Sequence, residues 1–285
     1  MVDLHLHSTF SDGSEEPETL VAQAAAAGLS ALSLTDHDTT RGCAPFAAAA
    51  YEKGIRTVTG VEISVENPDG ELHILGFGID PDHMELQRTL EQIRGGRHVR
   101  NLRMLEKLRD LGCPLEYDAV ASLAGDLEVV GRPHLAEALI RAGFVKDKQE
   151  AFARYLGHGA PAYCDRLRMG ATRAMALIRA AGGLPVLAHP HLLRLNRTAL
   201  RKVVTGLRKD GLAGLEAYHS EQNERVTAAL LWLARDLGLL VTGGSDYHGQ
   251  FNPSIRIGVG FGGLRVPDEC FDKLRERLTA RPACA

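Results

Sequence analysis

The feature that most constrains the fold of this chain is a repeated alternation of short apolar segments with longer stretches of helical periodicity. Strands that alternate with helices in this way form a mainly parallel sheet or barrel. The predicted strands are residues 3–7, 30–35, 56–66, 71–78, 184–188, 214–218 and 239–243. The predicted helices are Pro17–Ala27, 43–53, Ala171–Ala181, 197–209 and 224–237.

The middle of the chain interrupts this alternation. From residue 82 to 165 leucines recur at helical spacing, and the sequence predicts no strand there. Gly95 and Gly96 are expected to divide the first part of this stretch into two helices, because glycine weakens a helix interior. The alternation before and after the stretch predicts an α/β domain built from residues 1–80 and 166–285, with a helical insertion at 81–165.

The composition of the chain limits the classes of molecule that it is expected to bind. The net charge is −3, and proteins that grip long nucleic acids usually have a strong basic excess. A small anionic substrate or the end of a short oligonucleotide fits this charge better, and no stable protein partner is implied. No apolar run reaches the roughly 18 residues needed to span a bilayer. The first residues also lack the pattern of a signal peptide, so we expect a cytoplasmic protein without a membrane anchor.

Histidines and carboxylates gather in short motifs. His5 and His7 lie two apart on a predicted strand, so both side chains project to the same face. Imidazoles are costly to bury without partners, and a metal ion is the simplest shared partner. Several other motifs follow predicted strands, at the edge where α/β proteins place their sites. Their candidate ligands are Asp12, His37, Glu62, His73, His134, Asp246 and His248.

The chemistry of this set indicates a metal centre. Imidazole and carboxylate ligands without thiolate suit Mn²⁺, Fe²⁺ or Zn²⁺. Nine candidates are too many for one ion, and they suffice for two or three if Glu62 bridges. Clustered divalent ions are suited to the hydrolysis of phosphate esters. The alternatives are ordinary: each histidine taken alone could be a hydrogen-bonded or solvated side chain, and Asp12 could cap a turn.

The motifs together resemble one family. The chain is similar to the polymerase and histidinol phosphatase (PHP) family through DLHLHSTFSDG, TDHD, GVE, ELHILG, GRPH, AHP and GSDYHG, in this order. The short leading motif and the GRPH segment resemble members that remove the 3′-phosphate from nucleoside 3′,5′-bisphosphates. Some of those members also trim RNA or oligonucleotides from the 5′ end.

The resemblance implies a distorted (β/α)₇ barrel, a helical insertion that caps the active site, and three divalent ions, with Mn²⁺ expected and Fe²⁺ or Zn²⁺ as alternatives. The family often has histidine where Asp12 stands, which affects the third ion. Carried over to this chain, the ligand sets are His5, His7, Glu62 and Asp246 for the first ion, Glu62, His73 and His134 for the second, and Asp12, His37 and His248 for the third.

Other residues are candidates for substrate contact. Arg132 offers a two-pronged fork for a phosphate, or a salt bridge between domains. His189 could bind the phosphoryl group, protonate the leaving oxygen or support the site structurally. Ser8 and Arg41 are weaker candidates.

The remaining histidines and a run of arginines have less specific roles. The role of His191 stays open, and ordinary surface or hydrogen-bonding roles are expected for His83, His98, His158 and His219. A solvated basic helix face is the interpretation favoured for Arg94, Arg97, Arg100 and Arg103, with a path for nucleotide phosphates as the alternative.

Four functions compete at this stage. The first is a phosphatase that acts on the 3′-phosphate of nucleoside 3′,5′-bisphosphates, with a small nucleotide as its partner. The second is a 5′→3′ exonuclease acting on short oligonucleotide ends. The third is a histidinol-phosphate phosphatase, and the fourth is a non-catalytic PHP module that binds metal for structure or recruits a polymerase. The complete ligand set favours an enzyme over the module.

Overall fold

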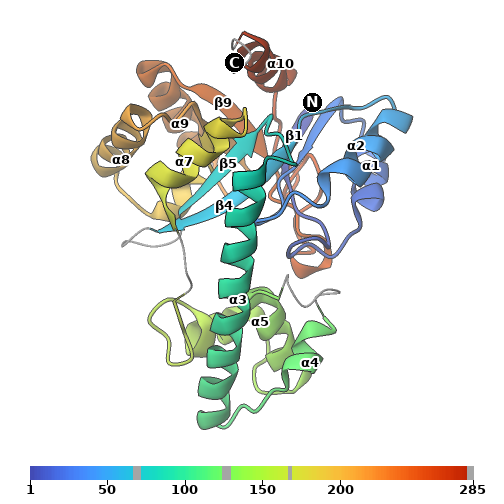
Figure 1. Ribbon diagram of the computed structural model, residues 1–285, viewed down its shortest axis with the longest axis vertical. Coiled ribbons are helices and arrows are strands. Elements are labelled where there is room, and N and C mark those ends of the chain that lie inside the picture. Colours follow the sequence, from blue (N-terminus) through green and yellow to red (C-terminus); the bar gives the residue numbers. More distant parts are fainter. Residues whose placement is uncertain (67–71, 124–129, 166–168, 281–285) are drawn as a thin grey trace.

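The computed structural model describes residues 1–66, 72–123, 130–165 and 169–280, which form a mixed α/β fold (Figure 1). One sheet has the strand order β1-β2-β3, with β1 at Val2–Leu6, β2 at Ala31–Leu34 and β3 at Arg56–Thr57. The second sheet has the order β6-β4-β5-β7-β8-β9. Its strands are β4 (Gly60–Glu66), β5 (Leu72–Phe77), β6 (Met169–Gly170), β7 (Leu184–Leu187), β8 (Gly214–His219) and β9 (Leu240–Gly244).

The strand directions confirm the prediction of a mainly parallel arrangement. Only β5 runs antiparallel to its neighbours, β4 and β7, among the strands in the described residues. The two sheets also meet. The amide of Asp246 donates to the carbonyl of His5 at 3.0 Å, and the amide of Asp38 donates to the carbonyl of Glu62 at 2.8 Å. These bonds connect β9 to β1 and the segment after β2 to β4, while a count of seven β/α units stays a prediction.

The prediction of one strand over 56–66 is wrong. The chain pairs with β2 through Arg56 and Thr57, and joins the second sheet only from Gly60. A β-carbon at Gly60 would lie 2.5 Å from the carbonyl oxygen of Leu34, a distance that real atoms do not reach. Glycine therefore permits the close crossing that brings β4 beside the end of β2. The turn predicted at residues 67–70 lies outside the described residues.

Helices cover the outer faces of both sheets. Helices α1 (Pro17–Ala26) and α2 (Cys43–Glu52) pack Leu20 and Phe46 against Leu32 of the first sheet. The predicted helices after β6, β7 and β8 are confirmed as α7 (Ala171–Ala180), α8 (Arg197–Lys209) and α9 (Glu224–Leu237). The short helices η3 (Pro190–Leu193) and η4 (Gly249–Phe251) follow β7 and β9, and α10 (Asp268–Thr279) lies near the end of the chain.

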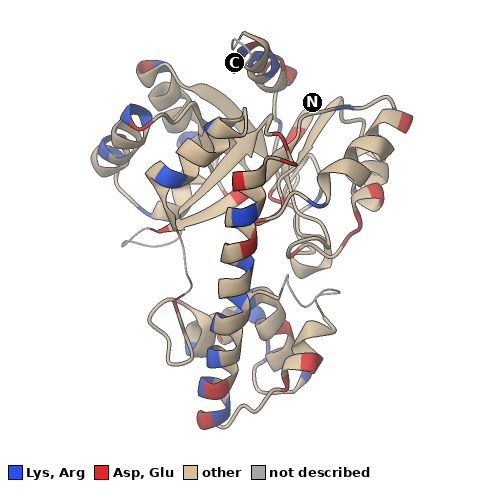
Figure 2. Cartoon of the chain, viewed as in Figure 1, with Lys and Arg blue, Asp and Glu red and all other residues tan. Residues whose placement is uncertain are grey.

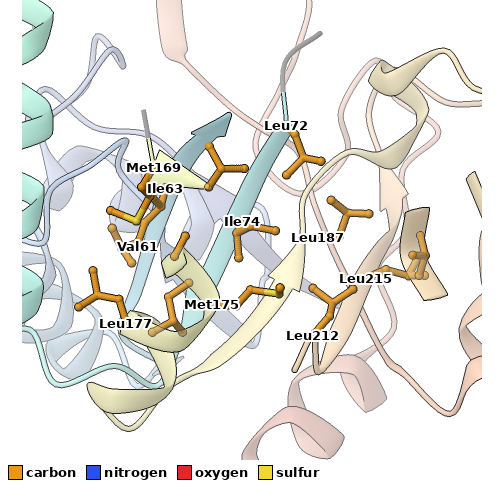
Figure 3. Close-up of a cluster of buried hydrophobic side chains, with 14 of the residues drawn as sticks. Val61, Ile63, Leu72, Ile74, Met169, Met175, Leu177, Leu187, Leu212 and Leu215 are labelled. Atoms are coloured by element: carbon orange, nitrogen blue, oxygen red, sulfur yellow. The ribbon is translucent and has the colours of Figure 1, made fainter. Parts of the chain in front are cut away.

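The main apolar core lies between the second sheet and its helices. Figure 3 shows Val61, Ile63 and Ile74 of β4 and β5 in one cluster with Met175 and Leu177 of α7. These strand residues are fully buried. The burial of these apolar side chains away from water holds the sheet to its helices. This packing also fixes the position of the strands, whose polar residues point toward the opposite face of the sheet.

A separate group of helices extends from the sheets (Figure 1). It comprises α3 (Met84–Asp110), α4 (Tyr117–Ala121), α5 (Arg132–Arg141), α6 (Lys148–Ala151) and the short helix η2 (Phe152–Leu156). It has a buried apolar cluster of its own, which includes Met104, Leu108, Leu135, Leu139 and Leu156. As predicted, the described part of residues 82–165 contains no strand. Nowhere in the described chain is a helix both long and apolar enough to cross a membrane.

The predicted break at Gly95 and Gly96 is wrong, because α3 continues through both residues over 27 positions. Its first half buries Leu86 and Leu90 in the main core, and its second half buries Met104 in the helical cluster. Each glycine costs a helix about 1 kcal/mol. The packing of the two halves of α3 outweighs that cost. The helix therefore connects the sheets to the helical segment without a break, over a length of about 40 Å.

The arginines of α3 do not form a solvated face. Figure 2 shows basic residues along this helix, but Arg97 and Arg100 are only 4% and 5% exposed, whereas Arg103 is exposed. The guanidinium of Arg97 pairs with the buried carboxylate of Asp38. Arg94 donates to the carbonyl oxygen of the same residue, Asp38, at 2.8 Å. Both contacts fasten the middle of α3 to the loop that follows β2.

We expect Arg97→Met to lower the free energy of unfolding by about 3–5 kcal/mol, because it removes the guanidinium that pairs with the buried carboxylate of Asp38. Urea denaturation would measure the change. Arg103→Met is the matched control on the exposed side of the same helix, and it should change the stability by less than about 0.5 kcal/mol. Equal denaturation midpoints for the two variants would contradict the importance of this pair.

Candidate metal centre

Three groups of histidine and carboxylate side chains converge around Glu62. The first group contains His5 and His7 from the end of β1 and Asp246 from the loop after β9. The Nε2 atoms of both histidines face Glu62 Oε2, at 3.3 Å for His5 and 3.2 Å for His7. They lie 3.4 Å and 3.2 Å from Asp246 Oδ1. The predicted first ligand set is therefore brought together.

The second group lies on the other side of His7. Asp12 Oδ1 is 3.3 Å from His248 Nε2, and Asp12 Oδ2 is 3.8 Å from His37 Nε2. The ring centroids of His7 and His248 are 4.1 Å apart and stacked. Asp12 comes from the turn after β1 and His37 from the loop after β2. The structure thus brings together the predicted set of Asp12, His37 and His248.

The third group corresponds to the set predicted for the second ion, from which it differs in one member. Glu62 Oε1 lies 2.9 Å from His73 Nδ1 and 3.0 Å from His189 Nε2. The two ring nitrogens are 3.2 Å apart. His73 stands near the start of β5, and it reaches this edge because β5 runs antiparallel to β4. His189 follows β7, and it lies beside Glu62 and His73, where the sequence suggested His134.

His134 is placed elsewhere. It lies in the first turn of α5, where its Nδ1 accepts a hydrogen bond from the amide of Gly131 at 3.0 Å. Its ring packs edge-on against Phe251. Among the described residues, neither His134 nor His189 belongs to a group whose ligand atoms all lie within 4.8 Å of one another, and the group that contains His73 is His37, Glu62 and His73. The buried ring of His134 is electrically neutral, since burial lowers its pKa to about 4.

The ligand atoms suit divalent cations. Buried polar atoms normally have hydrogen-bond partners. Here His5 Nε2, His7 Nε2, His37 Nδ1 and Asp12 Oδ1 are buried without a hydrogen-bond partner among the described residues, and they point into the cluster. Lone pairs on neutral imidazole nitrogens and carboxylate oxygens are metal ligands. Several imidazoles crowded around shared carboxylates are the donor set that such ions require.

The ionisation of the cluster also favours cations. Burial raises the pKa of the Glu62 and Asp246 carboxyls, but the surrounding imidazoles outweigh burial, and both pKa values lie well below the ordinary value. Burial lowers the pKa of His37 to about 3, so its ring stays neutral and keeps a lone pair. The same carboxylates raise the pKa of His7 to about 10 and hold the pKa values of His5 and His189 above the ordinary value. Without an ion these rings carry protons, which a bound cation would displace.

Backbone strain concentrates at this site. Asp38, His189 and Asp246 have φ values of 54°, 28° and 55°. Residues other than glycine rarely adopt this backbone conformation. Each such residue costs of order 1–3 kcal/mol, and such residues persist where the surroundings determine them. Gly244 supports the arrangement, because a β-carbon there would lie 2.4 Å from the amide nitrogen of His5. The loop after β9 can therefore approach β1 closely enough to deliver Asp246.

A second layer of polar residues holds the ligands, and the sequence reasoning missed two of them. Glu216 of β8 is fully buried and hydrogen-bonded to His5. His219, for which the sequence predicts a surface or hydrogen-bonding role, is buried, with its Nε2 3.4 Å from Asp246 Oδ2. The only sequence signal for either was a polar residue in the GLEAYH strand. His83, His98 and His158 lie outside the cluster, in the helical segment or at its start.

The structure shows other contacts for the two weaker substrate candidates. The hydroxyl of Ser8 donates to Asp36 at 2.6 Å, and its amide donates to the same carboxylate at 2.7 Å. Ser8 therefore fixes the turn that carries Asp12. Arg41 is exposed, with its guanidinium 5.8 Å from the ring centroid of Phe10.

A cavity of about 160 Å³ adjoins the cluster. Asp12, His37 and His73 form one part of its wall. Arg97 and Arg100 of α3 and Arg132 at the start of α5 also line it. The guanidinium of Arg132 stacks over the rings of Phe152 and Tyr163, 5.7 Å from each centroid. These cationic side chains lie beside the ligand cluster. An anion bound in the cavity would therefore contact both the arginines and the cluster.

Comparisons with known proteins agree with this geometry. The model of the PHP domain family matches residues 3–156. The chain is 35% identical to a 3′,5′-nucleoside bisphosphate phosphatase from Chromobacterium violaceum over 254 residues, which cover 87% of each chain. It is 37% identical to a 5′-3′ exoribonuclease from Haemophilus influenzae over 248 residues, 86% of this chain and 89% of the relative.

A solved structure shares the fold over nearly the whole chain. The structure of an amidohydrolase from Chromobacterium violaceum, with bound sulfate and no metal, superimposes with a TM-score of 0.88 and 33% identity. The match covers 97% of this chain and 96% of the other. The matched motifs, the convergent ligands and these likenesses together lead to one assignment: the chain belongs to the PHP family and is a metal-dependent phosphoesterase.

Proposed function

We propose that this enzyme hydrolyses the 3′-phosphate of nucleoside 3′,5′-bisphosphates, such as adenosine 3′,5′-bisphosphate, to give the 5′-monophosphate and phosphate. The observation that carries the proposal is the shared cavity, in which Arg97, Arg100 and Arg132 face the side of the ligand cluster formed by Asp12 and His37. A substrate with two phosphates could place one at the cluster and the other at the arginines. The relative from Chromobacterium violaceum supports this choice.

We assign three divalent ions to the three groups, with Mn²⁺ as the expected ion. His5, His7, Asp246 and Glu62 would hold the first, and Asp12, His37 and His248 would hold the second. Glu62, His73 and His189 would hold the third, with His189 in the place first suggested for His134. Bound ions of this kind act as Lewis acids on phosphoryl oxygens and lower the pKa of water.

The residues of the chain supply position and charge. The helical segment 81–165 would act as a cap, because it contributes Arg97 and Arg100 from α3 and Arg132 from α5 to the cavity wall. A guanidinium can hold two oxygens of one phosphate in a fixed plane. Phe152 and Tyr163 keep the Arg132 guanidinium in one orientation by stacking on it. The cap would thereby orient the substrate while it limits access of water.

Arg132→Ala is expected to weaken substrate capture more than turnover. A hydrogen bond to a charged group is worth about 1.5–3 kcal/mol, so KM should rise roughly 10- to 100-fold while kcat changes little. Arg132→Lys keeps the charge but loses the fork, and should recover only part of the affinity. Steady-state kinetics with saturating Mn²⁺ would measure both parameters. An unchanged KM in Arg132→Ala would remove this residue from the substrate site.

A phosphate-release screen with added Mn²⁺ tests the proposed substrate. Adenosine 3′,5′-bisphosphate should be converted to the 5′-monophosphate faster than other nucleotides and sugar phosphates. Chromatography would show which phosphate is removed. Turnover of histidinol phosphate without turnover of the bisphosphate would reject the proposal. Bound metal without turnover of any phosphoester would favour a non-catalytic module.

The second candidate is 5′→3′ cleavage of short oligonucleotides. The likeness to the Haemophilus influenzae exoribonuclease favours it, since that relative matches as much of the chain as the phosphatase does. Short RNAs with a 5′-phosphate provide the test. If their cleavage is substantially faster than hydrolysis of the mononucleotide, exonuclease action is the main activity.

A further inference from the structure

One buried carboxylate touches two of the three ligand groups. Glu216 lies on β8 and has no exposed surface. Its Oε1 is 3.0 Å from Nδ1 of His5, which belongs to the first group. Its Oε2 accepts a hydrogen bond of 2.7 Å from the backbone amide of His189, which belongs to the third. Burial of a carboxylate costs free energy unless the carboxylate is paired. The position of Glu216 between these two groups therefore indicates that it has a function there.

The contact with His5 fixes which ring nitrogen carries the proton. An ionised carboxylate can only accept, so Nδ1 of His5 must be the donor toward Glu216. Nε2 is then the ring nitrogen left to bind a cation through its lone pair. That atom faces Glu62 at 3.3 Å and Asp246 at 3.4 Å, and no described residue forms a hydrogen bond with it. Glu216 thus prepares His5 to bind a cation through Nε2, as carboxylates do behind metal-bound histidines in general.

The contact with His189 fixes a strained backbone. His189 has φ 28° and ψ 61°, and this conformation turns its ring toward Glu62 and His73. Such a conformation persists only where the surroundings determine it. The hydrogen bond from its amide to Glu216 Oε2 is a direct restraint on that conformation.

We propose that Glu216 is a positioning residue that couples the first and third ion subsites, by setting the tautomer of His5 and the backbone of His189 with its two oxygens. The inference rests on the metal centre assigned above. It predicts that the two subsites lose affinity together when Glu216 loses one acceptor. The subsite of Asp12, His37 and His248 has no contact of this kind with Glu216 and should be affected less.

Glu216→Gln is the sharpest variant, because it preserves size and removes one acceptor. The amide of His189 can only donate, so the glutamine oxygen must face it. The glutamine NH₂ then faces Nδ1 of His5, which must accept and move its proton to Nε2. The lone pair that faces Glu62 and Asp246 is lost. Thr242→Val is the matched control, because Thr242 pairs with Glu216 across β8 and β9, is fully buried, and has a hydroxyl without a partner.

The experiment compares the wild type with both variants, each loaded with Mn²⁺. Metal content after gel filtration and Mn²⁺ affinity by titration are the readouts. Glu216→Gln should bind Mn²⁺ at the affected subsites about 10- to 100-fold more weakly and retain fewer ions per chain. The rise in Tm caused by Mn²⁺ should also shrink, whereas a purely structural role would lower Tm equally with and without Mn²⁺. Thr242→Val should behave as the wild type in all three measurements.

Wild-type metal content and affinity in Glu216→Gln would overturn the proposal. If that variant does not fold, Glu216→Asp decides, since its shorter side chain keeps both oxygens but cannot reach both partners. Wild-type Mn²⁺ affinity in a folded Glu216→Asp would overturn the proposal equally. A wild-type protein that binds no Mn²⁺ would instead refute the metal centre itself, so the two failures are distinguishable.

Discussion

Replacement of His7 by alanine is expected to reduce phosphate release by at least about 10³-fold. The Nε2 of His7 lies 3.2 Å from both Glu62 and Asp246, and its Nδ1 is 3.7 Å from Asp12. The ring therefore stands between two of the ion subsites. Bound metal supplies several kcal/mol of charge stabilisation in the transition state, and each 1.4 kcal/mol corresponds to about a factor of ten in rate. Initial rates on adenosine 3′,5′-bisphosphate with added Mn²⁺ would measure the loss.

The matched control for this variant is His98→Ala. His98 is exposed on α3, and its ring contacts Tyr117 rather than the cluster. We expect nearly wild-type rates for it. Metal analysis should also show fewer ions per chain in His7→Ala than in His98→Ala. Comparable rates in the two variants would remove the metal centre from the reaction, however well the side chains converge.

Removal of the metal is expected to abolish turnover reversibly. Dialysis against a chelator should bring phosphate release to the background rate, and added Mn²⁺ should restore it. The buried ring nitrogens of His5, His7 and His37 give the physical reason, since no donor in the part of the chain that the structure describes takes the place of the cation. Substitution of Fe²⁺ or Zn²⁺ for Mn²⁺ in the same assay would rank the three ions.

The same titration should stabilise the fold. An ion that binds only the native state at 100 times its Kd adds about 2.7 kcal/mol, which for a chain of this size raises Tm by roughly 5–10 °C. Differential scanning calorimetry with and without Mn²⁺ would show the shift. Full activity in a preparation free of detectable metal would contradict both the chelation result and the assignment of the three groups.

Sequence patterns predicted most of the ligand cluster because short-range geometry decides it. Two residues apart on a strand, His5 and His7 must face the same side, and the strand that carries them is confirmed as β1. The loops after β2 and β9 follow strands of the same direction, so His37 and Asp246 were expected at a common edge. These relations depend only on the period of a strand and on the parallel arrangement.

Other features depend on contacts between distant residues. The continuity of α3 through Gly95 and Gly96 follows from packing at both of its ends, which no local propensity reveals. The burial of Arg97 follows from the position of Asp38, a residue 59 positions earlier in the chain. Periodicity alone correctly predicted that this stretch, with its arginines, is helical. It could not show which face of the helix would be buried.

The sequence by itself determined the strand and helix alternation, the types of ligand and the side of each strand on which they lie, because these depend on residue chemistry and local backbone periodicity. Only the tertiary structure decided that His189 and not His134 joins Glu62 and His73, and that Glu216 stands behind them. That choice depends on the antiparallel direction of β5 and on the strained turn after β7. Both arise from the pairing of strands that are far apart in the chain, so no local pattern specifies them.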